Sequence, residues 1–262
     1  YMYFDSTLYK DEFINKDLLE IINYNLNNNL VEPYFQAIMD NRTLEIVKYE
    51  ALMRIFDKNG NILMPNIFIH KAKKCRLYTK LMEILFDKII IYILKDNIHV
   101  SINLDYIDIL NPQIKKSLIS KIKEYEIGSF LTFEILESEK VSNFNMVNDF
   151  IKEVKKYGVK IAIDDFGTGF SNYENILNLD IDYIKIDGSL IKKIDEDIYL
   201  NLIKSIVLFA KQQNIKIVAE FVSDLKTLRY IRNIGIDFSQ GYHIGKPMNI
   251  NELLGIEDEK RA

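Results

Sequence analysis

The stretch KIAIDDFGTGFSN, residues 160–172, runs an apolar strand directly into two adjacent aspartates, Asp164 and Asp165. Two carboxylates about 4 Å apart repel each other by about 4 kcal/mol at an effective dielectric near 20. The end of an apolar strand is therefore an unfavourable place for this pair unless a further group stabilises it. We expect these two residues to bind a ligand.

The same order, a short strand followed by a helical stretch, recurs along the chain. Apolar residues at helical spacing predict helices over residues 11–26, 142–157, 199–213 and 224–233. Eight strands are predicted, over residues 32–39, 45–56, 99–104, 130–136, 160–166, 183–187, 216–221 and 238–243. This alternation indicates an α/β fold, a (β/α)8 TIM-like barrel. Only residues 40–44 separate the first two strands, too few for a crossover helix, so we expect the first strand to run antiparallel to its neighbour.

Composition narrows the class of protein. The chain has 262 residues, 48% of them hydrophobic, and a net charge of -4, so nothing suggests binding to duplex nucleic acid. Its single cysteine, Cys75, fits a reducing compartment, and the apolar run at residues 89–94 is far shorter than the ~20 residues of a membrane span. We expect a barrel domain over residues 13–255, a linker remnant over 1–12 and a tail over 256–262.

Alternation along each predicted strand separates an apolar face from a polar one. In SINL, for example, Ile102 and Leu104 share one face and Asn103 lies on the other. In a barrel the apolar face meets the helices, and the polar residue faces the mouth at the C-terminal ends of the strands. The residues assigned to the mouth are Gln36, Glu50, Asn103, Glu134, Asp164, Asp165, Lys185, Glu220 and Gln240.

The predicted mouth is rich in carboxylates, which cannot all stay ionised when buried without cations. Oxygen ligands suit Mg²⁺ and Mn²⁺, whereas His70, His99 and His243 show no spacing typical of zinc ligands. We expect Asp164 to bridge two metal ions while Asp165 holds the second. Such a pair of ions is the usual device for in-line attack on a phosphodiester.

Two neighbouring features have two interpretations each. Arg54 lies four residues beyond Glu50, about 13 Å along the strand, where it could clamp a phosphate or form a surface ion pair. The glycine-containing loop at residues 167–169 follows the aspartates and fits either a substrate-gating or interface role or a plain turn.

Seven ordered motifs resemble those of one family. YEALMR, at residues 49–54, contains Glu-Ala-Leu itself, and SINLD, FEILES, IAIDDFGTGFSN, YIKIDGSLI, VAEFV and QGYHIGKP follow in order. Over residues 31–247 the chain resembles the EAL-domain family of cyclic di-GMP phosphodiesterases. The resemblance implies a TIM-like barrel with an antiparallel first strand. It also implies hydrolysis of cyclic di-GMP to linear pGpG with two Mg²⁺ or Mn²⁺ ions, and inhibition by Ca²⁺.

The resemblance also assigns roles to single residues. It implies that the first ion is held by Glu50, Asn103, Glu134 and Asp164, and the second by Asp164, Asp165 and Glu220. The nucleophile would be a metal-bridging water hydrogen-bonded to Lys185, which with Glu50 and Glu220 makes up the catalytic set. Glu137 resembles the glutamate that steadies the loop after the aspartates. Gln36, Arg54 and Gln240 resemble substrate contacts.

Partners follow from the same resemblance. Members of the family often pair through the segment after the aspartates, here residues 172–179, so we expect a homodimer. Residues 1–13 resemble the linker after a GGDEF (diguanylate cyclase) domain, so we expect an upstream GGDEF or sensor domain in a longer parent. We expect a cytoplasmic location for this chain, with any membrane anchor of the parent outside it.

The chain departs from the family pattern after its seventh strand. The family usually has AEGVE where this chain has AEFVS, so Phe221 replaces glycine and Ser223 replaces the second glutamate. We expect Ser223 to cap the following helix, and the lost glutamate could weaken affinity or turnover. All expected metal ligands and Lys185 are present, which favours an active enzyme. One alternative is a weak or inactive EAL domain that senses cyclic di-GMP, and a less favoured one is a Schiff-base aldolase using Lys185.

Overall fold

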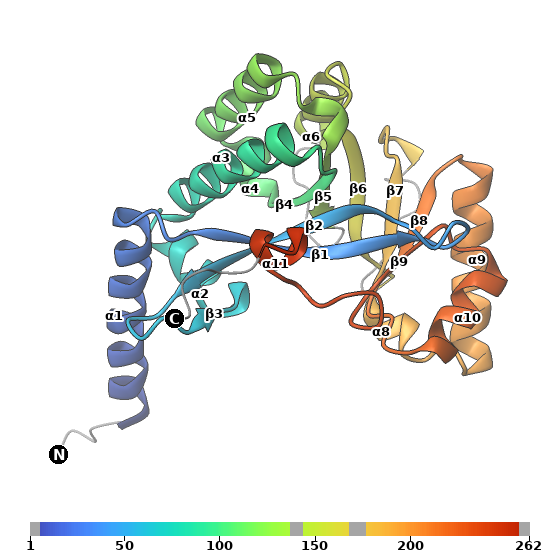
Figure 1. The fold of residues 1–262 in the computed structure, drawn as a ribbon, viewed down its shortest axis with the longest axis horizontal. Coiled ribbons are helices and arrows are strands. Elements are labelled where there is room, and N and C mark those ends of the chain that lie inside the picture. The colour runs from blue at the N-terminus through green and yellow to red at the C-terminus, as the bar shows by residue number, and fades with distance from the viewer. Residues whose placement is uncertain (1–5, 137–143, 168–176, 257–262) are drawn as a thin grey trace.

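The computed structural model describes residues 6–136, 144–167 and 177–256. Within them eight strands close into a barrel with helices outside, which confirms the predicted fold class (Figure 1). The barrel strands are β1 (Glu32–Asp40), β2 (Ile46–Phe56), β4 (Val100–Leu104), β5 (Leu131–Leu136), β6 (Lys160–Phe166), β7 (Tyr183–Ile186), β8 (Lys216–Ala219) and β9 (Phe238–Gln240).

The first strand is reversed, as its short hairpin predicts. β1 pairs antiparallel with β2 on one side and with β9 on the other, whereas the remaining neighbours around the barrel are parallel. One strand was missed: β3 (Ile62–Leu63), a two-residue strand that pairs with Ile55 and Phe56 at the end of β2. Such a short strand carries no alternation that a sequence pattern can detect.

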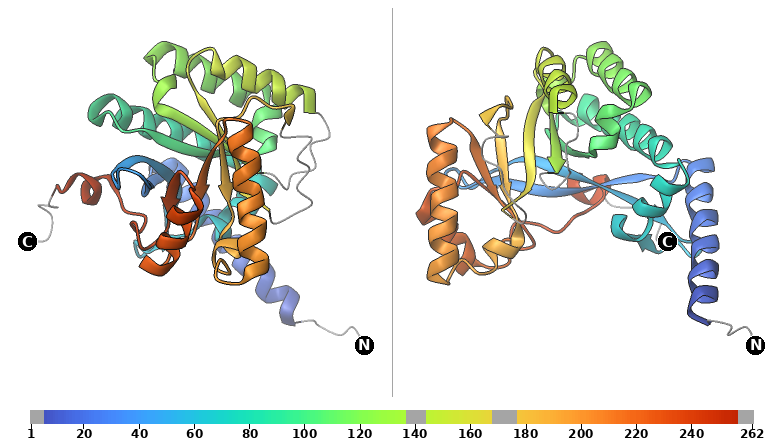
Figure 2. Two further views of the ribbon diagram at one scale, coloured as in Figure 1. Left: turned by 90° about the vertical axis from the view of Figure 1, so that its right-hand side faces the viewer. Right: turned by 180° about the vertical axis from the view of Figure 1, so that it is seen from behind.

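Helices cover the outside of the barrel. They are α1 (Ser6–Asn27), α2 (Pro65–Lys74), α3 (Tyr78–Asp96), α4 (Tyr106–Leu110), α5 (Pro112–Tyr125), α6 (Phe144–Lys155), α8 (Gly188–Ile191), α9 (Asp197–Gln212), α10 (Leu225–Ile234) and α11 (Ile250–Leu254). Seen from opposite sides, α9 and α10 lie at one end of the molecule, and α1 lies at the other end beside α2 (Figures 1 and 2).

The apolar faces of strands and helices meet in one continuous core. Outward-facing residues such as Ile102 and Phe133 are fully buried against helices, among them Phe150 of α6, whose ring stacks on that of Phe133. Burial of one such side chain contributes about 1.5–3 kcal/mol, so this layer supplies most of the stability that holds the strands in place. The apolar run at residues 89–94 lies in α3, where Ile89, Ile90 and Ile93 pack into this core while Ile91 and Leu94 are exposed. Among the described helices, none has the length and apolar character needed to cross a bilayer.

Helix α1 is fixed to the end of β2. The fully buried Asn25 donates from Nδ2 to the carbonyl of Phe56 (2.7 Å) and accepts at Oδ1 from the Phe56 amide (2.9 Å). The packing of this helix outside the barrel agrees with the prediction from residues 11–26, although the helix begins earlier, at Ser6.

Candidate active site at the mouth of the barrel

Strand register brings the predicted residues to one end of the barrel. Gln36 of β1 lies directly opposite Glu50 of β2, so their side chains share a face. On the next strands, Asn103 of β4 is the register partner of Glu134 of β5. β8 ends at Ala219, two residues earlier than predicted, so Glu220 extends from the strand end into the mouth.

A buried lysine is the centre of this arrangement. The Nζ of Lys185 lies 2.6 Å from Glu134, 2.9 Å from Asp164, 2.9 Å from Glu220 and 3.4 Å from Glu50. Only 1% of Lys185 is exposed. An ammonium group has three donors, so it cannot satisfy four carboxylates at once. The cluster therefore has more acceptor oxygen than the lysine can bind.

Glu50 is oriented by amides from both sides. Asn103 donates to its Oε1 (2.6 Å), and Gln240 donates to its Oε2 (2.6 Å). The Nε2 of Gln240 also lies 3.2 Å from Oε1 of Gln36, whose own amide donates to the carbonyl of Gly245 (3.2 Å). These bonds fix the carboxylate of Glu50 while leaving it beside the lysine.

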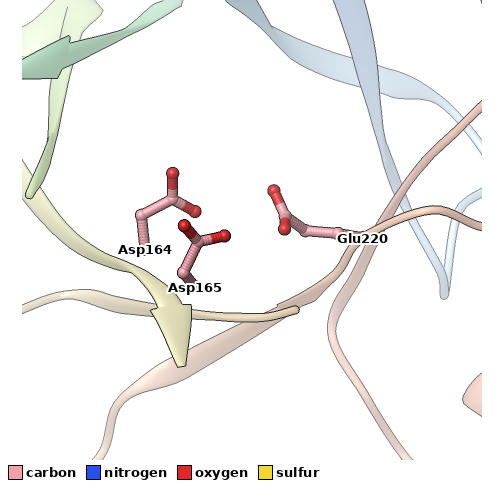
Figure 3. Close-up of side chains that lie close together, drawn as sticks. All are labelled: Asp164, Asp165 and Glu220. Atoms are coloured by element: carbon pink, nitrogen blue, oxygen red, sulfur yellow. The ribbon is translucent and has the colours of Figure 1, made fainter. Parts of the chain in front are cut away.

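The two adjacent aspartates reach the same side through a local irregularity. Successive strand residues normally face opposite ways, so Asp164 and Asp165 should diverge. Here the β6–β7 register shifts between Ile163 and Phe166, and Asp165 has φ 55, in the left-handed region. Consequently oxygens of Asp164, Asp165 and Glu220 come within 4.8 Å of one another, and the three carboxylates point toward a common centre (Figure 3).

Burial and crowding control protonation in this cluster. Burial raises the pKa of Glu134 to about 7 and that of Glu220 to about 8, against the pull of Lys185. Burial and the neighbouring Asp164 also raise the pKa of Asp165. Burial alone would raise the pKa of Glu50, but the charge of Lys185 and the hydrogen bonds from Gln240 and Asn103 together lower it. Burial alone would lower the pKa of Lys185, but the surrounding carboxylates together raise it well above its usual value.

These residues fit divalent cations. Five carboxylates face one lysine, and Oε1 of Glu134 is buried with no hydrogen-bond partner in the described part of the chain. Burial raises the pKa values of Glu134 and Glu220, and repulsion from neighbouring carboxylates adds to it. Hard oxygen donors of this kind suit Mg²⁺ and Mn²⁺. Among the described residues, the three acidic groups that gather within 4.8 Å are those expected for the second ion.

A cavity of about 680 Å³ opens beside the cluster. It is lined by the predicted residues Gln36, Glu50, Arg54, Asp165, Glu220 and Gln240. Arg54 is buried and lies with its guanidinium 5.7 Å from the ring centroid of Tyr34, so it faces the cavity and not bulk solvent. The described residues show no ion pair for Arg54, which argues against the surface-pair interpretation.

Sequence reasoning missed part of the lining. Tyr34, Lys192, Tyr242 and Lys246 also face the cavity, as does Phe221. For Tyr34 a signal existed, because it lies two residues before Gln36 on the same strand face. The other residues lie beyond strand ends, where alternation gives no guidance.

Three expectations fall on residues that the structure does not describe, and a fourth is wrong. Glu137 and residues 168–169 of the glycine loop lie outside the described residues, as does most of the segment 172–179. The prediction that Ser223 caps the next helix is wrong: Asp224 is the N-cap of α10 and accepts from the Thr227 amide, while the Ser223 hydroxyl donates to Asp224 (2.8 Å). Aspartate accepts this bond at least as well as serine does.

Fold and mouth together define a TIM-like barrel whose first strand is reversed and whose C-terminal end carries a carboxylate cluster around a lysine. The chain belongs to the EAL domain family, whose sequence profile matches residues 19–247.

Curated relatives and solved structures agree with this assignment. The chain is 32% identical over 255 residues to the cyclic di-GMP phosphodiesterase PdeA of Borreliella burgdorferi, covering 92% of this chain and 38% of the relative. It is 27% identical to the cyclic di-GMP phosphodiesterase PdeF of Escherichia coli, covering 79% of this chain and 29% of the relative. The chain thus spans well under half the length of either relative.

The fold is also that of solved EAL domains. The EAL domain of FimX from Pseudomonas aeruginosa bound to c-di-GMP superposes with a TM-score of 0.82 at 21% identity, over 88% of this chain and 96% of that one. The PaMucR phosphodiesterase in a c-di-GMP complex gives a TM-score of 0.83 at 23% identity, over 90% and 99%.

Proposed function

We propose that this chain hydrolyses cyclic di-GMP to linear pGpG. The observation that carries the proposal is the contact of one buried ammonium, that of Lys185, with four carboxylates in a mouth that opens onto a nucleotide-sized cavity. The names of the curated relatives, cyclic di-GMP phosphodiesterases, support the choice of substrate.

The carboxylates would hold two Mg²⁺ or Mn²⁺ ions, divided as the family resemblance implies. Glu50, Asn103, Glu134 and Asp164 are assigned to one, and Asp164, Asp165 and Glu220 to the other. When bound there, such ions lower the pKa of a water molecule and neutralise charge on the phosphoryl oxygens. Ca²⁺ would fill the same oxygens with looser geometry and inhibit.

The chain's own side chains have separate tasks. Lys185 remains protonated because its pKa lies well above the usual value, so it acts as a fixed positive charge and hydrogen-bond donor and not as a base. Burial raises the pKa of Glu220 to about 8, so its binding of a cation as a carboxylate would release a proton near neutral pH. Arg54, Gln36 and Gln240 face the cavity and would contact the phosphate and sugar of the substrate.

The reaction consumes one water molecule. Its oxygen forms a new bond to one phosphorus atom, the bond from that phosphorus to the 3′ oxygen breaks, and the 3′ oxygen takes up a proton. The ring of the cyclic dinucleotide opens, and a linear dinucleotide with a 5′ phosphate leaves.

Two other functions remain in competition. A cyclic di-GMP sensor that binds without cleaving is favoured by Ser223, which lines the cavity where the family usually has glutamate. A Schiff-base aldolase is disfavoured, because an amine nucleophile needs a lowered pKa and that of Lys185 is raised.

Product analysis tests the proposal. Cyclic di-GMP is incubated with the protein and Mg²⁺, Mn²⁺, Ca²⁺ or EDTA, and the products are separated by chromatography. We expect pGpG with Mg²⁺ or Mn²⁺ and none with Ca²⁺ or EDTA. Binding without pGpG under every condition would establish the sensor instead.

The remaining predictions concern the parent protein. A homodimer through residues 172–179, an upstream GGDEF or sensor domain, and a cytoplasmic location are predictions that follow from the family resemblance. We propose them as the setting in which this barrel works, with residues 13–255 as its extent.

A further inference from the structure

An exposed aromatic ring stands in the mouth beside the metal ligands. Phe221 directly follows Glu220, lines the 680 Å³ cavity and is 54% exposed. A large apolar ring left exposed in a cavity beside charged groups indicates a binding surface, because its apolar area is removed from water only when a ligand covers it. The proposed ligand set does not use this residue.

The backbone at Phe221 makes the choice of residue unusual. Its φ is 53, in the left-handed region that bulky L-residues rarely adopt. Glycine, which the family usually has at this position, adopts that conformation freely. The chain therefore keeps a ring here against the local backbone preference, and such strain is concentrated at ligand-binding sites.

The ring of Phe221 packs against two defined neighbours, Gly188 and Lys192. A Cβ built on Gly188 would lie 2.2 Å from Cδ2 and 2.4 Å from Cγ of Phe221, so the ring packs directly on the glycine backbone. The Nζ of Lys192 lies 4.4 Å from the ring centroid. Ring and ammonium thus form one unit, built from the segments that follow β7 and β8, and both line the cavity.

The rest of the cavity repeats this chemistry. Tyr34 lies with its ring centroid 5.7 Å from the guanidinium of Arg54, and Tyr242 lies with its centroid 5.7 Å from Nζ of Lys246. A ring beside a cation suits a nucleotide, since a base stacks on the ring and a phosphate pairs with the cation.

We propose that Phe221 is the stacking residue for one purine base of the dinucleotide, and that Lys192 pairs with the phosphate next to that base. The proposal rests on the proposed function and deepens it. It gives a reason for both departures in AEFVS: a ring that binds by stacking takes over from the glutamate that Ser223 replaces. Stacking tolerates any base, so affinity and not base selectivity should depend on Phe221.

The first test is steady-state hydrolysis of cyclic di-GMP by Phe221→Gly and Phe221→Tyr. We expect KM of the glycine variant to rise by about tenfold or more with kcat within threefold of wild type, and tyrosine to restore KM. Gly188→Ala, whose new methyl group must displace the ring, should raise KM in the same direction.

A matched control separates stacking from strain. Glu126, at the end of α5, has φ 53 like Phe221 and lies outside the cavity lining. Glu126→Gly should therefore relieve a similar backbone strain without changing KM. Phe221→Gly should melt no lower than wild type, because glycine suits the conformation. An unchanged KM in Phe221→Gly overturns the proposal.

The second test uses the absence of tryptophan from the sequence. Phe221→Trp gives the protein a single tryptophan at the proposed stacking site, and excitation near the red edge of its absorption band avoids the 16 tyrosines. With Ca²⁺ present to prevent turnover, cyclic di-GMP and GMP should quench its emission, and inorganic phosphate should not. Tyr125→Trp, exposed at the end of α5, provides a control that none of them should quench.

The outcomes distinguish the two proposals. Quenching without pGpG formation by the wild-type protein supports stacking and overturns hydrolysis. Hydrolysis by Phe221→Trp with emission unchanged at saturating dinucleotide overturns stacking and leaves hydrolysis standing.

Discussion

Replacing Lys185 with methionine should destabilise the metal-free protein strongly. The ammonium lies 2.6 Å from Glu134, and at an effective dielectric near 20 that pair alone is worth about 6 kcal/mol before the cost of burial is subtracted. Removing one member of a buried ion pair typically costs about 3–5 kcal/mol, because the partner charge stays behind. For a domain of this length, that corresponds to a melting temperature lower by roughly 10 °C.

Bound metal should partly restore the stability that Lys185→Met loses. Lys185 contacts oxygens of Glu134, Asp164 and Glu220, the carboxylates to which the proposed ions are also assigned. Methionine removes this competitor, so saturating Mg²⁺ should raise the melting temperature of Lys185→Met more than that of the wild-type protein. Thermal and urea unfolding in EDTA and in Mg²⁺ measure both effects.

Lys48 provides the matched control. It is a second buried lysine in the same barrel, with Nζ 3.7 Å from the ring centroid of Tyr183, and burial lowers its pKa to about 8. The described residues contain no ion pair to it, so Lys48→Met should cost less and leave the Mg²⁺ shift unchanged. A metal-free Lys185→Met protein within about 1 kcal/mol of wild type would refute the reasoning, since that is far below the cost of an unpaired buried charge.

Further variants test separate parts of the structure. Asp164→Ala should lower kcat by about a hundredfold or more while the protein stays folded, because even indirect supports of a metal site are worth 10–100-fold; turnover near wild type would contradict the ligand assignment. Ser223→Glu should lower KM or raise kcat for cyclic di-GMP, and no change in either would show that serine is tolerated. Burial raises the pKa of Asp108 to about 7 from its usual 3.8, so the folded protein retains a proton that the unfolded chain has lost. From about pH 4 to about pH 7 the wild-type protein should lose unfolding free energy relative to Asp108→Asn by about 1.4 kcal/mol per pH unit in urea titrations, and a constant difference would contradict this. Gly128→Ala should lower the unfolding free energy by about 1–3 kcal/mol or more, because its Cβ would lie 2.0 Å from the carbonyl oxygen of Tyr157; wild-type stability would show that the backbone can move apart.

Regular strands made much of the site predictable. Glu50, Asn103, Glu134 and Lys185 lie where alternation places them, because each strand is flat enough for a period of two to hold over its length. The short first hairpin likewise predicted the antiparallel β1, since five residues cannot hold a crossover helix.

Irregular backbone limited how many of the other site residues could be predicted from the sequence. Strict alternation would turn Asp165 away from Asp164, and only the left-handed φ at Asp165 brings both into the mouth. No residue pattern predicts the left-handed φ of Asp165, because aspartate adopts this conformation only occasionally. The cavity residues Lys192 and Tyr242 were missed for a related reason: both lie past strand ends, where tertiary packing and not local sequence sets their direction.

The reversed first strand changes where the chain enters the barrel. In an all-parallel barrel the leading segment joins the base, remote from the chemistry. Here β1 starts at the open end, so the chain runs from α1 directly to Tyr34 and Gln36. α1 is also hydrogen-bonded through Asn25 to the backbone of Phe56, two residues from Arg54. A tilt or twist of α1 would thus be transmitted to the rim of the cavity at two points of attachment, without passing through the packed interior.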